Sequence, residues 1–289
     1  MSAARRSRVA VGLVAAVTAL VYLPVLQSLV RQWASDDNYS HGFLVVPFAI
    51  YFGWLRRREL AALPIRPHWF GLVVAIGSLA LLLAGRLGAE LFLARVSLIG
   101  LTAGTVLFLY GTRHLRLLAF PIAFLLLMVP LPAVVFNQLA FPLQLLASSA
   151  GEAVLTASGI SVLREGNVLV LPTTSLEVVQ ACSGIRSLVS LLTLAIILGA
   201  LTESRRWARV VLALLALPVA IAANAARVAG TGLAAEWISP QAAEGFFHEF
   251  SGWVMFVVAF ALLLAAQRAL ASRPRLAMRA PSAPVVGAS

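Results

Sequence analysis

The sequence predicts an all-α polytopic membrane protein with about eight transmembrane helices and one small β-meander. Three observations predict this class. Hydrophobic residues make up 61% of the 289 residues and charged residues only 11%, and the mean hydropathy is +0.95, far outside the range of soluble domains. Several apolar runs reach the length of about 20 residues that a helix needs to cross a bilayer. Finally, the basic residues are all arginines, and most of them recur in every second connection.

The apolar runs predict the spans in order. We place them at 9–30, 42–55, 69–85, 91–110, 117–136, 183–201, 208–230 and 248–267. The run at 42–55 is short, because about 14 residues cover only about 21 Å of a hydrocarbon core that is roughly 30 Å thick. Arginines precede the first run as they do in a signal peptide, but that run is long and further spans follow. We therefore interpret it as a retained anchor.

The arginines orient the chain in the membrane. The clusters in alternate connections comprise Arg5, Arg6, Arg8, Arg56, Arg57, Arg58, Arg66, Arg113, Arg116, Arg205, Arg206, Arg209, Arg268, Arg273, Arg275 and Arg279. By the positive-inside rule these connections and both termini are cytoplasmic. The net charge of +11 could indicate a nucleic-acid partner, but this distribution fits membrane topology better, so we expect the lipid bilayer and no nucleic acid.

The longest outer connection, 137–181, is predicted to begin with an interfacial helix that has leucines on one side. Short apolar segments at 160–163, 167–171 and 175–179 follow, separated by turn residues, and they indicate a small β-meander. This meander leads the chain to Cys182. We expect one transmembrane domain over 1–272 and a disordered cytoplasmic tail over 273–289, which is rich in proline.

Cys182 is the single cysteine of the chain, and it stands where a polar segment gives way to an apolar helix. Unpaired backbone donors and the helix dipole lower the pKa of a thiol at a helix N-terminus, which favours the nucleophilic thiolate. A buried structural cysteine is the plain alternative. The position of Cys182 in its motif and the lack of other thiols favour the nucleophile.

Arg227 lies in an otherwise apolar stretch near the outer end of the run at 208–230. A guanidinium there needs a partner or a wet cavity, although it could also extend to the interface along its own aliphatic stem. Asn224, three residues earlier, shares the helix face and can reach the same pocket. His248 opens the last run, where it is either an ordinary interfacial histidine or a general acid and base.

Three further residues are candidates for supporting roles. Arg186, one turn after Cys182, can pair with Glu177 or with a substrate carboxylate, or can simply extend to the interface. Tyr39 and His41 lie in the first outer connection, on the same side as the site, where they serve the substrate or the architecture unless the segment is a plain turn closed by Gly42. No cofactor is expected, and no metal, because the four histidines are scattered and there is one thiol.

Four segments together resemble the exosortase/archaeosortase family of integral-membrane cysteine transpeptidases. They are Tyr39-Ser-His-Gly42, Leu176-Glu-Val-Val-Gln-Ala-Cys-Ser-Gly-Ile-Arg-Ser187, Asn224-Ala-Ala-Arg-Val228 and His248-Glu-Phe-Ser-Gly252. The resemblance covers about 36–267. The exclusive use of arginine and the high alanine content suggest a GC-rich genome and hence the bacterial branch, in the cytoplasmic (inner) membrane with the site on the periplasmic side.

The resemblance implies an enzyme that cleaves membrane-anchored proteins at a C-terminal sorting signal made of a Pro-Glu-Pro-like motif, a transmembrane helix and an Arg-rich end. Cys182 would form an acyl-thioester, with Arg227 and His248 completing the site. Either His248 moves the proton while Arg227 stabilises the oxyanion, or the two roles are exchanged. The acceptor that resolves the thioester, water or an amine on a lipid or glycan, stays open.

Two other classes of function compete with this interpretation. A transporter or export-channel subunit for exopolysaccharide or protein secretion would place Arg227 and His248 along a pathway, but the prolines do not form the paired broken helices typical of transporters. A catalytically dead scaffold would have lost one of the three central residues, and all three are present. The sequence therefore favours the cysteine enzyme.

Overall fold

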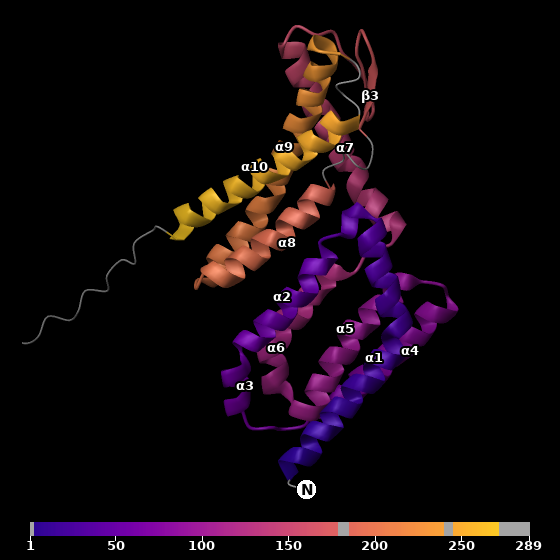
Figure 1. Ribbon diagram of the computed structural model, residues 1–289, viewed down its shortest axis with the longest axis vertical. Coiled ribbons are helices and arrows are strands. Elements are labelled where there is room, and N and C mark those ends of the chain that lie inside the picture. Colours follow the sequence, from indigo (N-terminus) through magenta and orange to yellow (C-terminus); the bar gives the residue numbers. More distant parts are fainter. Residues whose placement is uncertain (1–2, 179–184, 240–244, 272–289) are drawn as a thin grey trace, which may run out of the picture. The chain divides into compact units, whose positions relative to one another are not determined.

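The computed structural model describes residues 3–178, 185–239 and 245–271, without the side chains of 3–11 and 245–249. The chain divides into two compact units, Met1–Leu143 and Gln144–Ser289 (Figure 1). The predicted disordered tail at 273–289 lies outside the described residues.

The first unit is built from helices alone. Its elements are α1 (Ala3–Ser35), η1 (Asp37–Tyr39), α2 (Gly42–Leu55), α3 (Arg57–Ala62), α4 (Phe70–Leu87), α5 (Leu91–Tyr110), α6 (Thr112–Phe124), η2 (Leu125–Met128) and the start of α7 (Ala133–Ala157). Four of the predicted spans correspond to α1, α2, α4 and α5. Gly111 has a φ of 92°, a conformation that favours glycine, and it turns the chain directly from α5 into α6.

Close packing and buried hydrogen bonds hold this unit together. The Tyr22 hydroxyl on α1 lies 2.9 Å from the Ser97 hydroxyl on α5, and both residues are buried. Trp33 Nε1 donates to the carbonyl of Met128 at 3.0 Å. Such bonds satisfy polar groups that would otherwise be costly to bury, and the second one ties the end of α1 to η2.

The predicted span at 117–136 differs from the structure, which divides it into α6, η2 and the start of α7. Pro130 and Pro132 explain the break. Proline lacks the backbone N–H of a helical hydrogen bond and disfavours helical geometry in the residue before it. The prediction of one continuous helix over 117–136 was therefore wrong, and helix α6 ends 12 residues before Phe136.

The second unit combines the rest of α7 with three strands and three helices. These are β1 (Leu163–Glu165), β2 (Val168–Val170), β3 (Ser175–Glu177), α8 (Ile185–Thr202), α9 (Arg206–Trp237) and α10 (Gly245–Ala271). The strands form an antiparallel sheet in the order β1-β2-β3, with Leu163 opposite Val170 and Val168 opposite Glu177. The predicted β-meander is confirmed, and the last three spans correspond to α8, α9 and α10.

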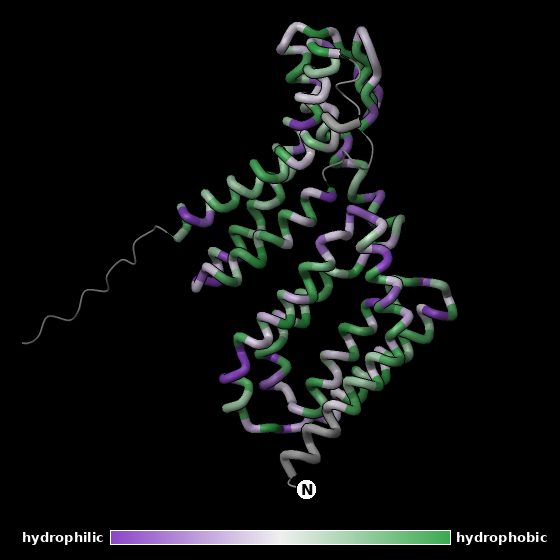
Figure 2. Tube along the Cα trace, in the orientation of Figure 1, coloured by the Kyte–Doolittle hydropathy of each residue, from purple (hydrophilic) through white to green (hydrophobic). Residues whose placement is uncertain are grey.

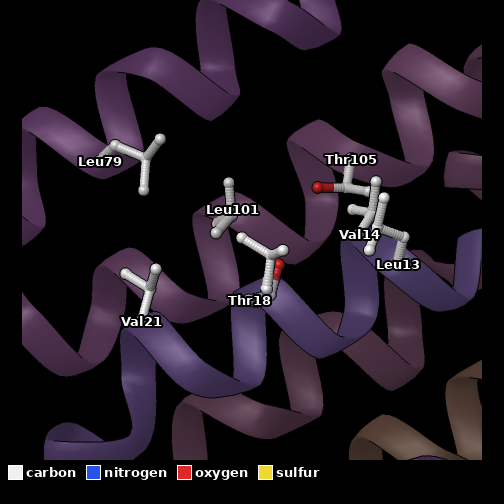
Figure 3. A pocket seen from close by; sticks show the side chains of 8 residues that line it. Leu13, Val14, Thr18, Val21, Leu79, Leu101 and Thr105 are labelled. Carbon is white, nitrogen blue, oxygen red and sulfur yellow. The ribbon is translucent and has the colours of Figure 1, made fainter. Parts of the chain in front are cut away.

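Seven of the described helices are long and apolar enough to cross a membrane, namely α1, α4, α5, α7, α8, α9 and α10. Many large apolar side chains on them are exposed, including Leu20, Ile76 and Leu214, and hydrophobic residues run along these helices in Figure 2. An apolar pocket of about 300 Å³ lies between α1, α4 and α5. Figure 3 shows Val21, Leu79 and Leu101 among the residues that line it. The chain is a multi-pass membrane protein.

Helix α7 is longer than the interfacial helix predicted at the start of the outer connection, and its 25 residues meet the length and composition of a span. Its C-terminal half nevertheless packs against the meander. Ala147 and Leu155 of α7 share a buried cluster with Leu169 and Leu171, and Arg164 Nε lies 2.6 Å from the Glu152 carboxylate. An ion pair beside a small sheet is typical of the aqueous side of an interface rather than of the hydrocarbon core.

Candidate active site

Helix α9 joins two separate apolar clusters of the second unit. Its 32 residues extend about 48 Å, compared with roughly 30 Å for a hydrocarbon core. The first part packs with α8 and α10 in a cluster of Leu191, Ala195, Leu212, Ala216, Ala220, Ala259 and Leu263. The second part contributes Val228 and Ala235 to the cluster formed with α7 and the meander.

Arg227 lies where one cluster gives way to the other. Ala223 packs against the first cluster and Val228 belongs to the second. About 20 helical residues cross a hydrocarbon core. If the core begins at Arg206, at the start of α9, it ends beside Arg227, and the guanidinium would lie at the level where the helix leaves the hydrocarbon.

The guanidinium of Arg227 lies against α10 at Gly252. A Cβ built on Gly252 would meet three atoms of that group, Cζ at 3.1 Å, Nη2 at 3.3 Å and Nη1 at 3.4 Å. The group packed at Gly252 is thus the Arg227 guanidinium, a partner that no pattern in the sequence alone identifies.

A small cavity of about 10 Å³ adjoins this contact. It is lined by residues of three helices, the polar Ser187 on α8 and Asn224 and Arg227 on α9 among them, together with Leu191, Ala223, Gly252, Met255, Phe256 and Ala259. Asn224 is buried, with 6% of its surface exposed. Asn224 and Arg227, three residues apart on one face of α9, both line this cavity. Ser187 was not predicted, because a single serine in an apolar run gives no sequence signal.

His248 lies in the first turn of α10, and its side chain is outside the described part of the chain. Gly252 follows one helical turn later, and residues four apart lie on the same helix face. The backbone of the turn that carries His248 is therefore next to the contact between Gly252 and Arg227. The structure brings together the helix faces that bear two of the three predicted central residues.

Cys182 falls in 179–184, outside the described residues, but the chain is described on both sides of it. On the N-terminal side Val178 is 2% exposed, and its N–H donates to the Asn167 carbonyl at 2.8 Å. Asn167 Nδ2 in turn donates to the Val178 carbonyl at 3.2 Å. On the C-terminal side α8 begins at Ile185, close to the predicted start, and Ser187 lines the cavity beside Arg227.

Asn167 is a residue that sequence reasoning used only as the start of a strand. Its backbone carbonyl and side-chain amide both bind Val178, so it fixes the last described residue before the Cys182 segment. Its place after Arg164-Glu165-Gly166 could have suggested a turn residue. Arg186, the remaining candidate of this unit, lies in the first turn of α8 and is half-buried.

Tyr39 and His41 belong to the first unit, where they have architectural contacts. The Tyr39 ring in η1 lies 6.0 Å from the Phe136 ring and 6.5 Å from the His41 ring. His41 is 5% exposed, and its Nε2 lies 3.0 Å from the Leu127 carbonyl, so this nitrogen is the donor. These contacts fasten the first connection to η2 and to the start of α7.

Burial shifts the pKa values of both Tyr39 and His41. Desolvation lowers the pKa of His41, against the opposing effect of its hydrogen bond to the Leu127 carbonyl. Desolvation and the charge of Asp36 raise the pKa of Tyr39. Burial therefore favours the neutral forms of both side chains.

Among the described residues no group of three or more His, Cys, Asp or Glu side chains could hold a metal ion. The Arg227 guanidinium, with Asn224 and Ser187 beside it, is suited to binding an oxyanion, because a guanidinium presents several N–H donors in a fixed plane.

Comparison with known proteins adds one match. The model of a family described as transmembrane exosortase (Exosortase_EpsH) matches residues 33–265. This range includes all seven candidate residues, from Tyr39 to His248. No match to a curated protein or to a solved structure was found.

Proposed function

The chain belongs to the transmembrane exosortase family, and on this premise we propose that it is a cysteine transpeptidase that cleaves the C-terminal sorting signals of membrane-anchored proteins. These signals combine a Pro-Glu-Pro-like motif, a transmembrane helix and an Arg-rich end. The nucleophile is Cys182, and Arg227 and His248 complete the site. The acceptor is an amine on a surface, lipid or glycan carrier.

One observation carries this proposal above the others. The Arg227 guanidinium lies against Gly252, one turn from His248, and Ser187 shares the adjoining cavity five residues after Cys182. We infer that this contact lies where α9 leaves the hydrocarbon. A substrate held by its own transmembrane helix presents its scissile peptide at this level. Nothing in a transport pathway requires such a convergence at one leaflet.

The chemistry proceeds in two transfers. The Cys182 thiolate attacks the carbonyl carbon of the scissile peptide bond, and a C–S bond forms while the C–N bond breaks. His248 donates a proton to the leaving amine. The acceptor amine, or water, then attacks the thioester carbonyl, gives its proton to His248, and expels the thiolate.

Arg227 stabilises the negative oxygen in both tetrahedral intermediates and the thiolate between turnovers. We prefer this division of roles because a guanidinium holds its proton far more tightly than an imidazole, which makes histidine the better proton donor. Asn224, which is buried and shares the cavity with Arg227, supports the guanidinium from the same helix. Arg186 is placed to contact the substrate at the start of α8.

The proposed location is the cytoplasmic (inner) membrane of a bacterium, with both termini inside and the site on the periplasmic side. The arginine-rich connections support this orientation by the positive-inside rule. A transmembrane domain over 1–272 would then carry the whole site.

Co-expression tests the proposal. A tagged substrate with a Pro-Glu-Pro, transmembrane and Arg-rich tail is followed by blot with the wild type, with Cys182→Ala, and with Ser158→Ala as a control at an exposed position. We expect tail removal by the wild type and the control, and none by Cys182→Ala. Removal that continues with Cys182→Ala, or several intact tails with a well-folded wild type, would contradict the proposal and favour a transport or export role.

A further inference from the structure

Gly252 has a role beyond general helix packing. We propose that it is a positioning residue, whose missing side chain allows the Arg227 guanidinium to lie against the first turns of α10. The geometric part of this inference depends only on the described residues. Its catalytic consequence rests on the function proposed above.

The distances show how little room there is. Nonbonded carbon atoms are at their optimal separation at about 3.5–4.0 Å, whereas a Cβ at position 252 would lie 3.1 Å from Cζ of Arg227 and 3.3 and 3.4 Å from its two terminal nitrogens. Any residue other than glycine therefore displaces the guanidinium by some tenths of an ångström, or pushes α10 away from α9.

The contact at Gly252 differs from those of the other glycines in this unit. A Cβ at Gly232 would collide with the side chain of Leu155, at 2.8 Å, which is an ordinary apolar packing contact. A Cβ at Gly230 meets no atom of the described residues within 4 Å. At Gly252 the three nearest atoms all belong to the Arg227 guanidinium. The space that glycine provides there is occupied by a cation.

The surroundings limit how the guanidinium can respond. The adjoining cavity measures only about 10 Å³, which is room for about one water molecule. On its other sides the cavity is bounded by Ser187 and Asn224 together with apolar residues of α8, α9 and α10. Among the described residues this cavity therefore offers a displaced guanidinium little room, and a side chain at 252 changes its present orientation.

The displacement has a consequence for the site. Gly252 follows His248 by one turn, about 6 Å along the helix axis, so a side chain at 252 changes the position of the guanidinium relative to the turn that carries His248. Misplacement of a catalytic group by about 1 Å can cost about 10²-fold in rate. We expect about a 10-fold loss for Gly252→Ala and about a 100-fold loss for Gly252→Val.

The first test needs no substrate. Because Cys182 is the single cysteine, alkylation of the detergent-solubilised full-length protein by iodoacetamide reports the pKa of this thiol when the rate is followed against pH. If Gly252 holds Arg227 in position, Gly252→Ala raises that thiol pKa, as Arg227→Ala does. Gly230→Ala is the matched control and leaves it unchanged.

A second variant separates positioning from stability. Gly232→Ala lowers the thermal midpoint through its contact with Leu155 but leaves the pKa of the thiol unchanged. A folded Gly252→Ala protein with the wild-type alkylation profile would overturn the proposal. So would an equal change in Gly232→Ala, because the effect would then follow loss of stability.

The processing assay supplies the catalytic readout. Gly252→Ala should lower kcat with little change in KM, and the loss should shrink to less than about twofold in an Arg227→Lys background, since coupled residues are non-additive. Fully additive losses of kcat in the double variant of Gly252→Ala and Arg227→Lys would overturn the catalytic part of the proposal. If the wild type cleaves no tail, the proposed function fails, and the alkylation profile still decides the role of Gly252.

Discussion

The carboxylate of Glu236, near the end of α9, accepts two hydrogen bonds from Thr173 in the turn between β2 and β3, one from the backbone N–H at 3.1 Å and one from the hydroxyl at 2.6 Å. These bonds fasten the meander to the helix that carries Arg227. The buried cluster of α7, the meander and α9 lies beneath them. The meander therefore holds Val178, the last described residue before Cys182, in a fixed relation to α9.

We predict that Glu236→Ala loosens this attachment. A hydrogen bond to a charged group contributes about 1.5–3 kcal/mol, and partial exposure reduces this to about 1 kcal/mol here. The thermal midpoint in detergent should fall slightly, and tail processing should slow by a few fold because the Cys182 segment is less well positioned. Thr173→Val should have a smaller effect, because it removes the hydroxyl bond but keeps the backbone N–H donor. The double variant should be no worse than Glu236→Ala alone. Additive losses would show that the two residues act independently.

We expect Arg227 to be required for the rate of tail processing rather than for folding. Removal of an oxyanion donor costs about 10²–10³-fold in kcat, so Arg227→Ala should lower processing by that factor. Arg227→Lys keeps the charge but lacks the planar donor fork, and it should recover at most about a tenth of the wild-type rate. Arg58→Lys, at an exposed position of α3, is the control. Near-normal processing by Arg227→Ala would remove this residue from the chemistry.

Close contact between α4 and α5 depends on glycine. A Cβ at Gly104 would lie 2.7 Å from the backbone nitrogen of Ala75, and one at Gly71 would overlap the backbone of Phe108. Small residues of this kind let membrane helices approach closely. Gly104→Val should therefore lower the free energy of unfolding by about 2–3 kcal/mol, measured as loss of the folded, monodisperse protein on heating. Gly77→Ala on α4, where no described atom lies within 4 Å, should be neutral.

The sequence predicts the membrane class, the meander and most of the spans, because hydrophobic length and turn residues are local properties. It predicts α6 and α7 poorly. Pro130 and Pro132 interrupt an apolar run whose hydropathy alone does not show the break, and the packing of α7 on the meander is a tertiary contact.

The candidate site, like the fold, is predicted from the sequence only where it depends on local patterns. The residue types and their order point to Cys182, Arg227 and His248, and helix periodicity places Asn224 beside Arg227. The contact of Arg227 with Gly252 and the lining of the cavity by Ser187 depend on how α8, α9 and α10 pack, which no local pattern determines. The contacts of Tyr39 with Phe136 and of His41 with Leu127 are likewise tertiary, and the sequence does not show them.

His41 should make stability depend on pH. Burial lowers the pKa of His41 in the folded protein below its ordinary value of about 6.5, so the unfolded chain binds the proton more readily. The stabilisation is complete above about pH 6.5 and declines as the pH falls toward the folded pKa. The thermal midpoint of the wild type should fall more between pH 7.5 and pH 5 than that of His41→Gln, which keeps an N–H donor for Leu127. Parallel curves for the two proteins would contradict this.

The two ends of α7 should lie on the same, outer side of the membrane, although its length and composition permit a crossing. The charges explain why. Arg113 and Arg116 place the start of α6 inside, and Arg205, Arg206 and Arg209 place the end of α8 inside. The connection from α7 to α8 must then be outside, and α6 with η2 must cross if α7 does not.

The contacts of α7 favour this arrangement. The residues after Gln144 pack on the meander, and the ion pair of Glu152 with Arg164 would be costly in hydrocarbon. From Thr112 to Met128, α6 and η2 extend about 28 Å at 1.5 and 2.0 Å per residue, close to the thickness of the hydrocarbon core, roughly 30 Å. This segment is therefore long enough to make the crossing beside α2, with which it is in contact.

Cysteine labelling decides between the two topologies. In a Cys182→Ala background, Val134→Cys and Ser158→Cys introduce thiols at exposed positions near the two ends of α7. Both should react with a membrane-impermeant maleimide in intact spheroplasts, whereas Arg113→Cys should react only after the membrane is opened. Labelling at Ser158→Cys without labelling at Val134→Cys would show instead that α7 crosses the bilayer and that α6 with η2 returns to the side from which it enters.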